Sequence, residues 1–460
     1  MQSPWPILLA PFAIAAALCW AQNPAEDGPK PVRERNWNQI LGPSQGRWPA
    51  PRPVLTWFTN LEQAQAIAAR EGRPLFVVLR CLPCKQCADF DAAVLEGGPI
   101  LTPLLQQFVT VRLTNVQSLD LRQFPMQSMQ DLDLSWWGWF LSPQGSIYGV
   151  FGGKDEKGDS SRISVNGLAA TLKRVLDHHF DPRHADWEVD VKPLRGDKPV
   201  TALDLPGFAS WGRRFVKENP IECIHCHQVA EILRQPAIDA KTFDKQRDLQ
   251  IWPYPENIGI QVLRDDGLLV AKVSEGSPAA AAGIEVGDRI ASAINRKLFS
   301  EADLRTVMQR VAVDGGPLEL RWLRKGKLMQ GILDLKPGWK RVELGWRQSI
   351  AGGNIGAHPG FAWPNAIKDE EKKKLGIHPD RMAIRPYFGK DQAAWLARNA
   401  GLTISDVIVA VNGKSPNVSG RDFMSLFRLA FEPGDEVTLH VRDNKGRERD
   451  VKYKATANGR

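Results

Sequence analysis

The stretch PLFVVLRCLPCKQCADFDAAVL, residues 74–95, joins an apolar strand directly to a helix, with cysteines at the junction. Residues 74–81 form a largely apolar run that is typical of a strand buried on both faces. The residues that follow are predicted as a helix, which places Cys81 and Cys84 at its first turn. A cysteine there feels the positive end of the helix dipole and the unpaired backbone amides, and both stabilise a thiolate. The stretch therefore predicts a reactive cysteine pair at a strand-to-helix junction.

The flanking elements extend this pattern into an α/β domain over residues 52–185. The expected elements are an amphipathic helix at 59–73 that is capped by Thr59 or Asn60 and ends at Gly72, a strand at 108–113, two strands around a Pro-Gln-Gly turn at 137–153, and a closing helix at 163–180. This order, with a CxxC after the first buried strand, resembles the thioredoxin fold. The resemblance implies that Cys81 attacks a disulfide and Cys84 resolves the mixed disulfide.

Two positions depart from the usual thioredoxin pattern. Arg80 stands where that family has Trp before the first cysteine, and Ser135 and Trp136 lie where its cis-proline is expected. Cys87 is an additional thiol, spaced with the other two at i, i+3 and i+6 along one helix face. The cluster is therefore also compatible with a structural disulfide or with a thiolate site for a soft metal such as zinc or copper.

A second cysteine motif, CIHCH, occupies residues 223–227 and follows an expected amphipathic helix. CxxCH is the attachment signature of c-type haem: Cys223 and Cys226 would form thioethers and His227 would bind the iron. The short helical segment around it, residues 200–252, is too short to enclose a haem by itself. A disulfide, or a zinc site that uses the same cysteines and histidines, are the alternatives.

The sixth ligand of such a haem cannot be a methionine from the same segment, because none occurs between Met129 and Met308. His178, His179 and His184 lie just upstream and are candidates for that position.

The N-terminus indicates export. Residues 1–21 contain no charged residue and hold an apolar run that suits a secretory signal peptide cleaved after Ala21. A polar, Pro-rich disordered linker is expected at 22–51. No later stretch is long and apolar enough to span a bilayer. The expected location is therefore the periplasm or another exported compartment, which also satisfies the requirement of haem attachment.

The C-terminal half contains ENIGI (256–260), GSPAAAAG (276–283) and a Gly-Asp-Arg-Ile sequence from Gly287. These motifs resemble a PDZ domain of the bacterial type over residues 253–336. The resemblance implies that Ile258, Gly259 and Ile260 form the loop that receives the C-terminal carboxylate of a peptide or protein partner.

A weaker second copy is expected at 374–460, where AGLTISDVIVAVNGK repeats the order of AGIEVGDRIASAINRK. Its alternative role is that of a structural spacer. Residues 337–373, rich in Trp, Gly and Pro, are expected to form the linker between the copies. The fold class is therefore multidomain: a thioredoxin-like α/β domain, a helical CxxCH segment and two PDZ-like, partly open β-barrel domains.

Composition narrows the possible functions. The net charge of +8 is spread along the chain, which argues against a nucleic-acid-binding face. No nucleophile turn, catalytic triad or phosphate-binding loop indicates a hydrolase or a kinase. The combination resembles exported multidomain proteins of planctomycete type. It predicts a thiol–disulfide oxidoreductase with a covalent haem and PDZ domains that recruit partners. The alternatives are a non-enzymatic envelope scaffold and a metal-binding protein that uses the cysteine clusters and His227.

Overall fold

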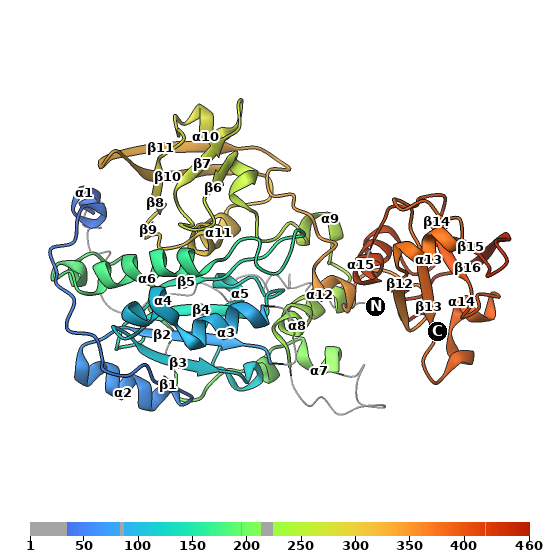
Figure 1. The fold of residues 1–460 in the computed structure, drawn as a ribbon, viewed down its shortest axis with the longest axis horizontal. Helices are drawn as coiled ribbons and strands as arrows, with labels where there is room; N and C mark the ends of the chain where they lie inside the picture. The colour runs from blue at the N-terminus through green and yellow to red at the C-terminus, as the bar shows by residue number, and fades with distance from the viewer. Residues whose placement is uncertain (1–34, 83–86, 195, 213–223, 419) are drawn as a thin grey trace, which may run out of the picture.

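The computed structural model describes most of the chain in three parts (Figure 1). An α/β domain carries one sheet, a β-rich middle domain lies against it, and a C-terminal domain lies to one side. None of the helices in the described part of the chain is long and apolar enough to cross a membrane. The predicted signal peptide, Cys84 and Cys223 lie outside the described residues, which are 35–82, 87–194, 196–212, 224–418 and 420–460.

The α/β domain is built on a five-stranded sheet in the order β1-β3-β2-β4-β5. The first three strands pair in parallel, and β4 and β5 are antiparallel. Side chains of β2 alternate between a core shared with α2 and a core shared with α4 and α6, so the strand is buried on both faces as predicted. The bounds are β1 (Trp57–Phe58), α2 (Leu61–Glu71), β2 (Leu75–Arg80), α3 (Ala88–Glu96), α4 (Gly98–Leu105), β3 (Val109–Leu113), α5 (Met126–Met129), β4 (Trp136–Leu141), β5 (Ile147–Phe151) and α6 (Val165–His179).

Local signals in the sequence explain where these elements start and stop. The Asn60 side chain accepts a hydrogen bond from the amide of Gln63 and caps α2, and Gly72 ends that helix with a left-handed φ of 61°. The predicted caps and the predicted hairpin between β4 and β5 are confirmed.

The predicted helix after β2 starts later than expected. Cys81 is not helical, and α3 begins only at Ala88, after Cys87 in a left-handed conformation with φ of 57°. A helix cannot continue through such a residue. The expectation that Cys81 and Cys87 share one helix face is therefore wrong.

The predicted disordered linker is ordered from residue 35 onward. Asn36 caps the short helix α1 (Trp37–Leu41), and Ile40 and Leu41 are buried against Trp187 and its neighbours. Two apolar side chains in an otherwise polar stretch are enough to anchor it.

The described residues around CIHCH contain helices and do not form a separate module. Trp211, Ile224 and Cys226 belong to the same hydrophobic core as Val77 and Met129 of the α/β domain. The segment therefore packs on the end of the sheet where β2 finishes (Figure 1). Its helices are α7 (Phe208–Gly212), α8 (Cys226–Asp239) and α9 (Lys245–Asp248).

The middle domain has a four-stranded sheet, β11-β10-β8-β9, and a separate two-stranded sheet, β6-β7. These sheets do not close into a barrel, so the expected partly open barrel is instead two small sheets that share one core. The elements are η4 (Pro255–Ile258), β6 (Ile260–Val262), β7 (Val270–Val273), α10 (Pro278–Ala281), β8 (Arg289–Ala293), β9 (Arg296–Lys297), α11 (Glu301–Arg310), β10 (Gly316–Arg324) and β11 (Lys327–Leu335).

The C-terminal domain has a five-stranded sheet in the order β12-β13-β14-β15-β16. It starts earlier than residue 374, because β12 lies in the stretch expected to be a linker. That stretch also contains the short helix α12 (Gln348–Ala351), which packs against α8 and α15. The elements are β12 (Trp363–Ala366), α13 (Asp369–Lys374), β13 (Ile384–Tyr387), α14 (Leu396–Asn399), β14 (Val407–Val411), α15 (Gly420–Ala430), β15 (Glu436–Arg442) and β16 (Glu448–Lys454).

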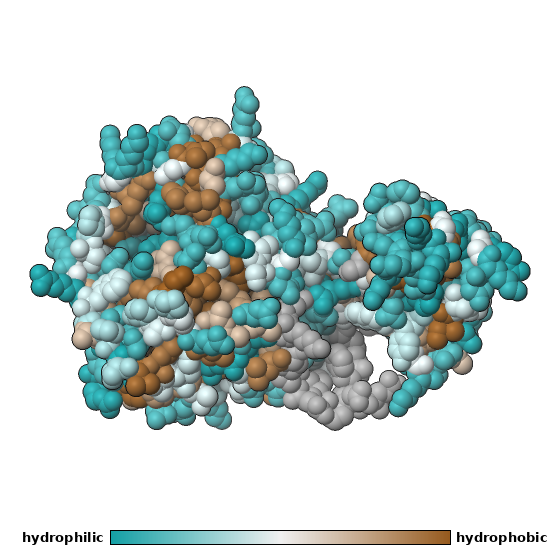
Figure 2. Space-filling view, viewed as in Figure 1, coloured by the Kyte–Doolittle hydropathy of each residue, from teal (hydrophilic) through white to brown (hydrophobic). Residues whose placement is uncertain are grey.

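The three parts differ in how closely they associate. Helix α11 of the middle domain lies against β5 and α5 of the α/β domain, and its residues from Glu301 to Met308 are all buried. The two domains therefore form one body. Figure 2 shows the C-terminal domain as a mostly hydrophilic lobe beside that body.

Candidate functional site

Cys81 lies at the end of β2, in the position that the sequence predicted for the attacking thiol. It is 4% exposed. Its backbone amide donates a hydrogen bond to the carbonyl of Ser135, with a nitrogen–oxygen distance of 3.0 Å. Ser135 is thus the residue opposite the cysteine, where the thioredoxin pattern led us to look. Cys84 lies outside the described residues, and its resolving role stays a prediction.

The partner of the Cys81 sulfur comes from the other cysteine motif. The Nδ1 atom of His225, the central residue of CIHCH, lies 2.9 Å from the Cys81 Sγ. At this distance a hydrogen bond joins the two groups, either from thiol to imidazole or from imidazolium to thiolate. The two motifs, 144 residues apart, therefore form one site.

The start of α8 holds His225 in place. His225 is the residue before the helix, and its amide donates to the Gln228 Oε1 at 2.9 Å. The backbone is capped by Gln228, so the ring can point towards Cys81. The rings of His225 and His227 stack nearly parallel, with centroids 5.6 Å apart.

Cys226 is buried next to this pair. The Gln130 Nε2 lies 3.8 Å from its sulfur, and the Gln130 Oε1 accepts a hydrogen bond from the Trp139 Nε1 at 3.3 Å. Gln130 is a site residue that sequence reasoning missed. Its only signal was its place five residues before Ser135, in the loop expected to face the cysteines.

A c-type haem site requires an oriented histidine ligand and accessible cysteine thiols, and the described residues provide only the histidine. The His227 Nδ1 lies 3.4 Å from the Glu231 Oε1, and a carboxylate at Nδ1 orients an imidazole and leaves its Nε2 for iron. Cys226, however, is only 5% exposed, because protein atoms cover it. A thioether to a porphyrin would require this packing to open. The ligand therefore fits and the thioether does not, and Cys223 lies outside the described residues.

Cys87 is poorly suited to metal binding. It is buried, and its sulfur lies 3.4 Å from the Asp159 carbonyl. Burial raises the pKa of the Cys87 thiol, although a contact with the Ser135 hydroxyl partly offsets this. A thiol that stays protonated is a weak metal ligand. Within the described residues, no group of three His, Cys, Asp or Glu side chains is arranged to hold a metal ion.

The upstream histidines lie at the far end of the sheet and cannot be the sixth ligand of a haem on His227. His179 contacts the Tyr148 hydroxyl at 2.8 Å through Nδ1 and the Gly72 carbonyl at 3.0 Å through Nε2. Gly72 precedes β2 and Cys81 follows it, so about 20 Å of strand separates the two ends. His178 pairs with Asp190 in the same cluster.

The loop expected to bind a peptide carboxylate is well ordered. Ile258 and Ile260 are buried in the core of the middle domain. Gly259 has a φ of 92°, and a Cβ there would lie 2.1 Å from that of Ser277, so only glycine fits. Its amide donates to the Glu256 carbonyl at 3.0 Å and its carbonyl accepts from the Ser274 amide at 2.7 Å. The Gly259 amide is therefore already engaged within the chain.

Two protein families match parts of this chain. Residues 56–130 match the family described as thioredoxin-like, and residues 257–333 match the PDZ domain. The chain contains a thioredoxin-like domain and a PDZ domain. Among solved structures, the HtrA-type protease AlgWS227A with decapeptide matches at 20% identity and a TM-score of 0.20, over 30% of this chain and 40% of that one. The chain thus spans less than half of that protease. No curated protein matches it.

The thioredoxin-like and PDZ domains share a charged interface. Arg162, from the loop after β5, contacts Glu301 of α11 at 2.8 Å and Glu256 of η4 at 3.0 Å. The guanidinium also lies over the Tyr254 ring, 4.0 Å from its centroid. A side chain of the thioredoxin-like domain therefore bridges helix α11 and the turn η4 of the PDZ domain.

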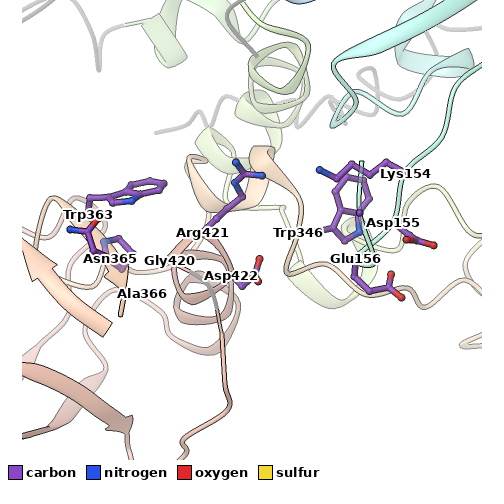
Figure 3. A pocket seen from close by; sticks show the side chains of 12 residues that line it. Lys154, Asp155, Glu156, Trp346, Trp363, Asn365, Ala366, Gly420, Arg421 and Asp422 are labelled. Atoms are coloured by element: carbon purple, nitrogen blue, oxygen red, sulfur yellow. The ribbon is translucent and has the colours of Figure 1, made fainter. Parts of the chain in front are cut away.

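A cleft of about 510 Å³ lies between the C-terminal domain and the rest of the chain. Figure 3 shows Trp363 and Arg421 on one side and Trp346 and Lys154 on the other. At this place α15 sits directly on the edge strand β12: a Cβ on Gly420 would lie 2.1 Å from the Pro364 carbonyl oxygen. The start of α15 therefore lies directly against β12 at Pro364.

Proposed function

We propose that this protein is a thiol–disulfide oxidoreductase in which Cys81 is the nucleophile and His225 its base. One observation carries the proposal: the 2.9 Å contact between the Cys81 sulfur and the His225 Nδ1. A cysteine and an imidazole at hydrogen-bond distance are the parts of an activated thiol nucleophile. Proton transfer from sulfur to nitrogen gives a thiolate beside an imidazolium, which lowers the pKa of the thiol.

The reaction follows from thiol chemistry. The Cys81 thiolate attacks one sulfur of a disulfide, a mixed disulfide forms, and the other sulfur leaves as a thiolate that takes up a proton. A second thiol of the protein, Cys84 in our prediction, then attacks Cys81 and releases the reduced substrate. The substrate gains two electrons and two protons, and the cysteine pair becomes a disulfide. The carbonyl of Ser135 holds the backbone of Cys81 during these steps.

The test is the ionisation of Cys81, measured as ultraviolet thiolate absorbance of the wild type minus that of Cys81→Ser. A difference titration does not depend on access of a reagent to a buried sulfur. We expect a midpoint clearly below the ordinary cysteine pKa of about 8.5. His225→Gln should raise it towards that value, while His378→Gln, at an exposed histidine of the C-terminal domain, should not. An ordinary midpoint in the wild type would refute the proposal.

We also propose that the PDZ domain binds peptides, as the alternative envelope-scaffold function. Within the described sheets, β6 (Ile260–Val262) pairs with β7 alone, so its outer edge is available for an added strand. Ile258, Gly259 and Ile260 would receive the carboxylate end, for which the Gly259 amide would have to leave the Glu256 carbonyl. The C-terminal domain, with β12 at a sheet edge beside α15, would be a second PDZ copy that serves as a spacer, because α15 closes on that edge.

Covalent haem on Cys223, Cys226 and His227 is a second proposal. The Glu231 contact of His227 supports the iron ligand, and thioether formation would require the packing over the Cys226 sulfur to open. Haem would supply one-electron chemistry beside the thiol pair, and it requires export, which we propose from residues 1–21. The test is a visible spectrum and an intact mass after expression with haem-c maturation machinery. A Soret band that is lost in Cys226→Ala would support haem. A colourless protein with the mass of the polypeptide alone would exclude haem and leave free cysteines in CIHCH.

A further inference from the structure

One short segment connects the thiol site to the PDZ domain. It comprises residues 129–135, MQDLDLS, from the last residue of α5 to the residue before β4. Two of its residues contact the thiol site. The side-chain Nε2 of Gln130 lies 3.8 Å from the Cys226 sulfur, and the backbone carbonyl of Ser135 accepts a hydrogen bond from the backbone amide of Cys81 at 3.0 Å. A displacement of this segment therefore moves groups that contact both cysteines.

The same segment is held by side chains from far along the chain. Asp131 accepts hydrogen bonds from Arg305 of α11 at 3.0 Å and from Arg347 at 2.7 Å. Asp133 contacts Arg347 at 3.1 Å and accepts the Ser349 amide of α12 at 2.6 Å. We call Asp131, Asp133, Arg305 and Arg347 the carboxylate hub. Its side chains are at most 2% exposed.

The arginines of the carboxylate hub keep Asp131 ionised. Although burial alone would raise it, the pKa of Asp131 is lowered, because Arg347 and Arg305 favour the carboxylate. Charges removed from water need partners in good geometry, so the hub has one preferred arrangement. Next to it, the Thr306 hydroxyl lies 3.2 Å from the Met129 carbonyl and 2.9 Å from that of Ala302. The position of α11 is thus transmitted to the start of the segment.

We propose that Asp131 and Asp133 are positioning residues, through which the PDZ helix α11 and the linker helix α12 set the geometry of the Cys81–His225 site. The inference rests on the proposed thiol function and adds regulation to it. A ligand of the PDZ domain that shifts α11 changes the equilibrium between the reduced and oxidised forms of Cys81. By thermodynamic linkage, the redox state of Cys81 changes the affinity for that ligand by the same factor.

A second set of contacts between α11 and the thioredoxin-like domain can serve as the control. These contacts join α11 to β5 and to the loop after β5: Arg162 pairs with Glu301, and Asp303 accepts a hydrogen bond from the Val150 amide at 3.0 Å. These contacts do not involve residues 129–135. A substitution there weakens domain association without acting directly on the segment.

The experiment compares Arg305→Lys and Thr306→Val, which act on the segment, with Arg162→Lys, which acts on the second set of contacts. Each variant of the full chain is titrated for the Cys81 thiolate, with its Cys81→Ser counterpart as the blank, and unfolded with urea. We expect the first two to raise the midpoint by about half a pH unit, equivalent to an ionisation constant about threefold smaller. Arg162→Lys should leave the midpoint unchanged even where it lowers stability.

The outcomes separate the two proposals. An unchanged midpoint in Thr306→Val and Arg305→Lys, with a shifted midpoint in His225→Gln, would overturn the positioning role and leave the thiol function standing. An equal shift in Arg162→Lys would also overturn it, because general loosening would then explain the effect. If His225→Gln shifts nothing, the thiol function itself fails. Thr306→Val keeps the side-chain shape, so it carries the test if Arg305→Lys does not fold.

Discussion

The PDZ domain and the C-terminal domain have similar orders of strands and helices, but their long helices lie in different surroundings. Helix α11 is buried from Glu301 to Met308 and pairs its charges with the thioredoxin-like domain. Helix α15 buries one face only and packs on β12 and α12. Glu301 and Gly420 both lie at the start of these helices. The first reaches Arg162, and the second lies against the Pro364 carbonyl.

The difference shows that a charged helix can become part of a core when each charge meets a partner. The sequence of α11, EADLRTVMQR, reads as a surface helix by its composition. The helix can be buried because Arg162, Asp131 and the backbone of β5 form ion pairs and hydrogen bonds with its charged side chains. The PDZ domain is therefore built into the body, and the C-terminal domain is attached through the linker helix.

The largest expected effect that tests this comparison is the loss of a hub arginine. Arg305→Met should lower the free energy of unfolding by about 3–5 kcal/mol, because it leaves the buried Asp131 short of one partner. Arg428→Met in α15 should cost about 1–3 kcal/mol, since Arg428 donates to the Ala351 and Ile355 carbonyls. Urea unfolding followed by tryptophan fluorescence measures both. Equal losses of unfolding free energy in the two variants would mean that buried charges contribute no more to the packing of α11 than to that of α15.

An intermediate effect concerns acid. Burial lowers the pKa of His358, in the C-terminal domain, to about 3. In the unfolded chain the histidine has a pKa of about 6.5 and becomes protonated below that pH, whereas in the folded domain it stays neutral. The stability therefore falls as the pH drops below about 6.5. Between pH 7.5 and pH 5 the expected loss is about 2 kcal/mol. His358→Gln should remove this loss, as measured by urea unfolding at both pH values. A variant that keeps the full acid dependence would contradict the assignment.

The smallest expected effect lies at the start of α15. Gly420→Ala adds a Cβ that would lie 2.1 Å from the Pro364 carbonyl oxygen. Overpacking costs about 1–3 kcal/mol, and the better helix propensity of Ala returns up to about 1 kcal/mol, so a net loss of about 1 kcal/mol is expected. Gly352→Ala at the end of α12, where φ is −86° and a Cβ would meet no atom closer than 3.5 Å, serves as the control. Increased stability of Gly420→Ala would show that α15 is not pressed onto β12.

Much of the architecture was predictable because it rests on local signals. The apolar run of β2, the Asn60 cap and Gly72 stop of α2, and the glycine and proline motifs of the PDZ domain each act within a few residues. Two errors came from tertiary contacts. Residues 35–51 are ordered because Ile40 and Leu41 find a distant apolar surface, and β12 forms in a supposed linker because β13 offers an edge.

The sequence by itself determined that two cysteine motifs exist and that Cys81 follows a buried strand. Periodicity and spacing encode both. Only the tertiary structure decided that His225, and not His227, meets the Cys81 sulfur, and that Gln130 and Ser135 complete the site. Hydrogen bonds between side chains 144 residues apart leave no trace in local pattern. They depend on the packing of α8 against the end of the sheet, which the whole core specifies.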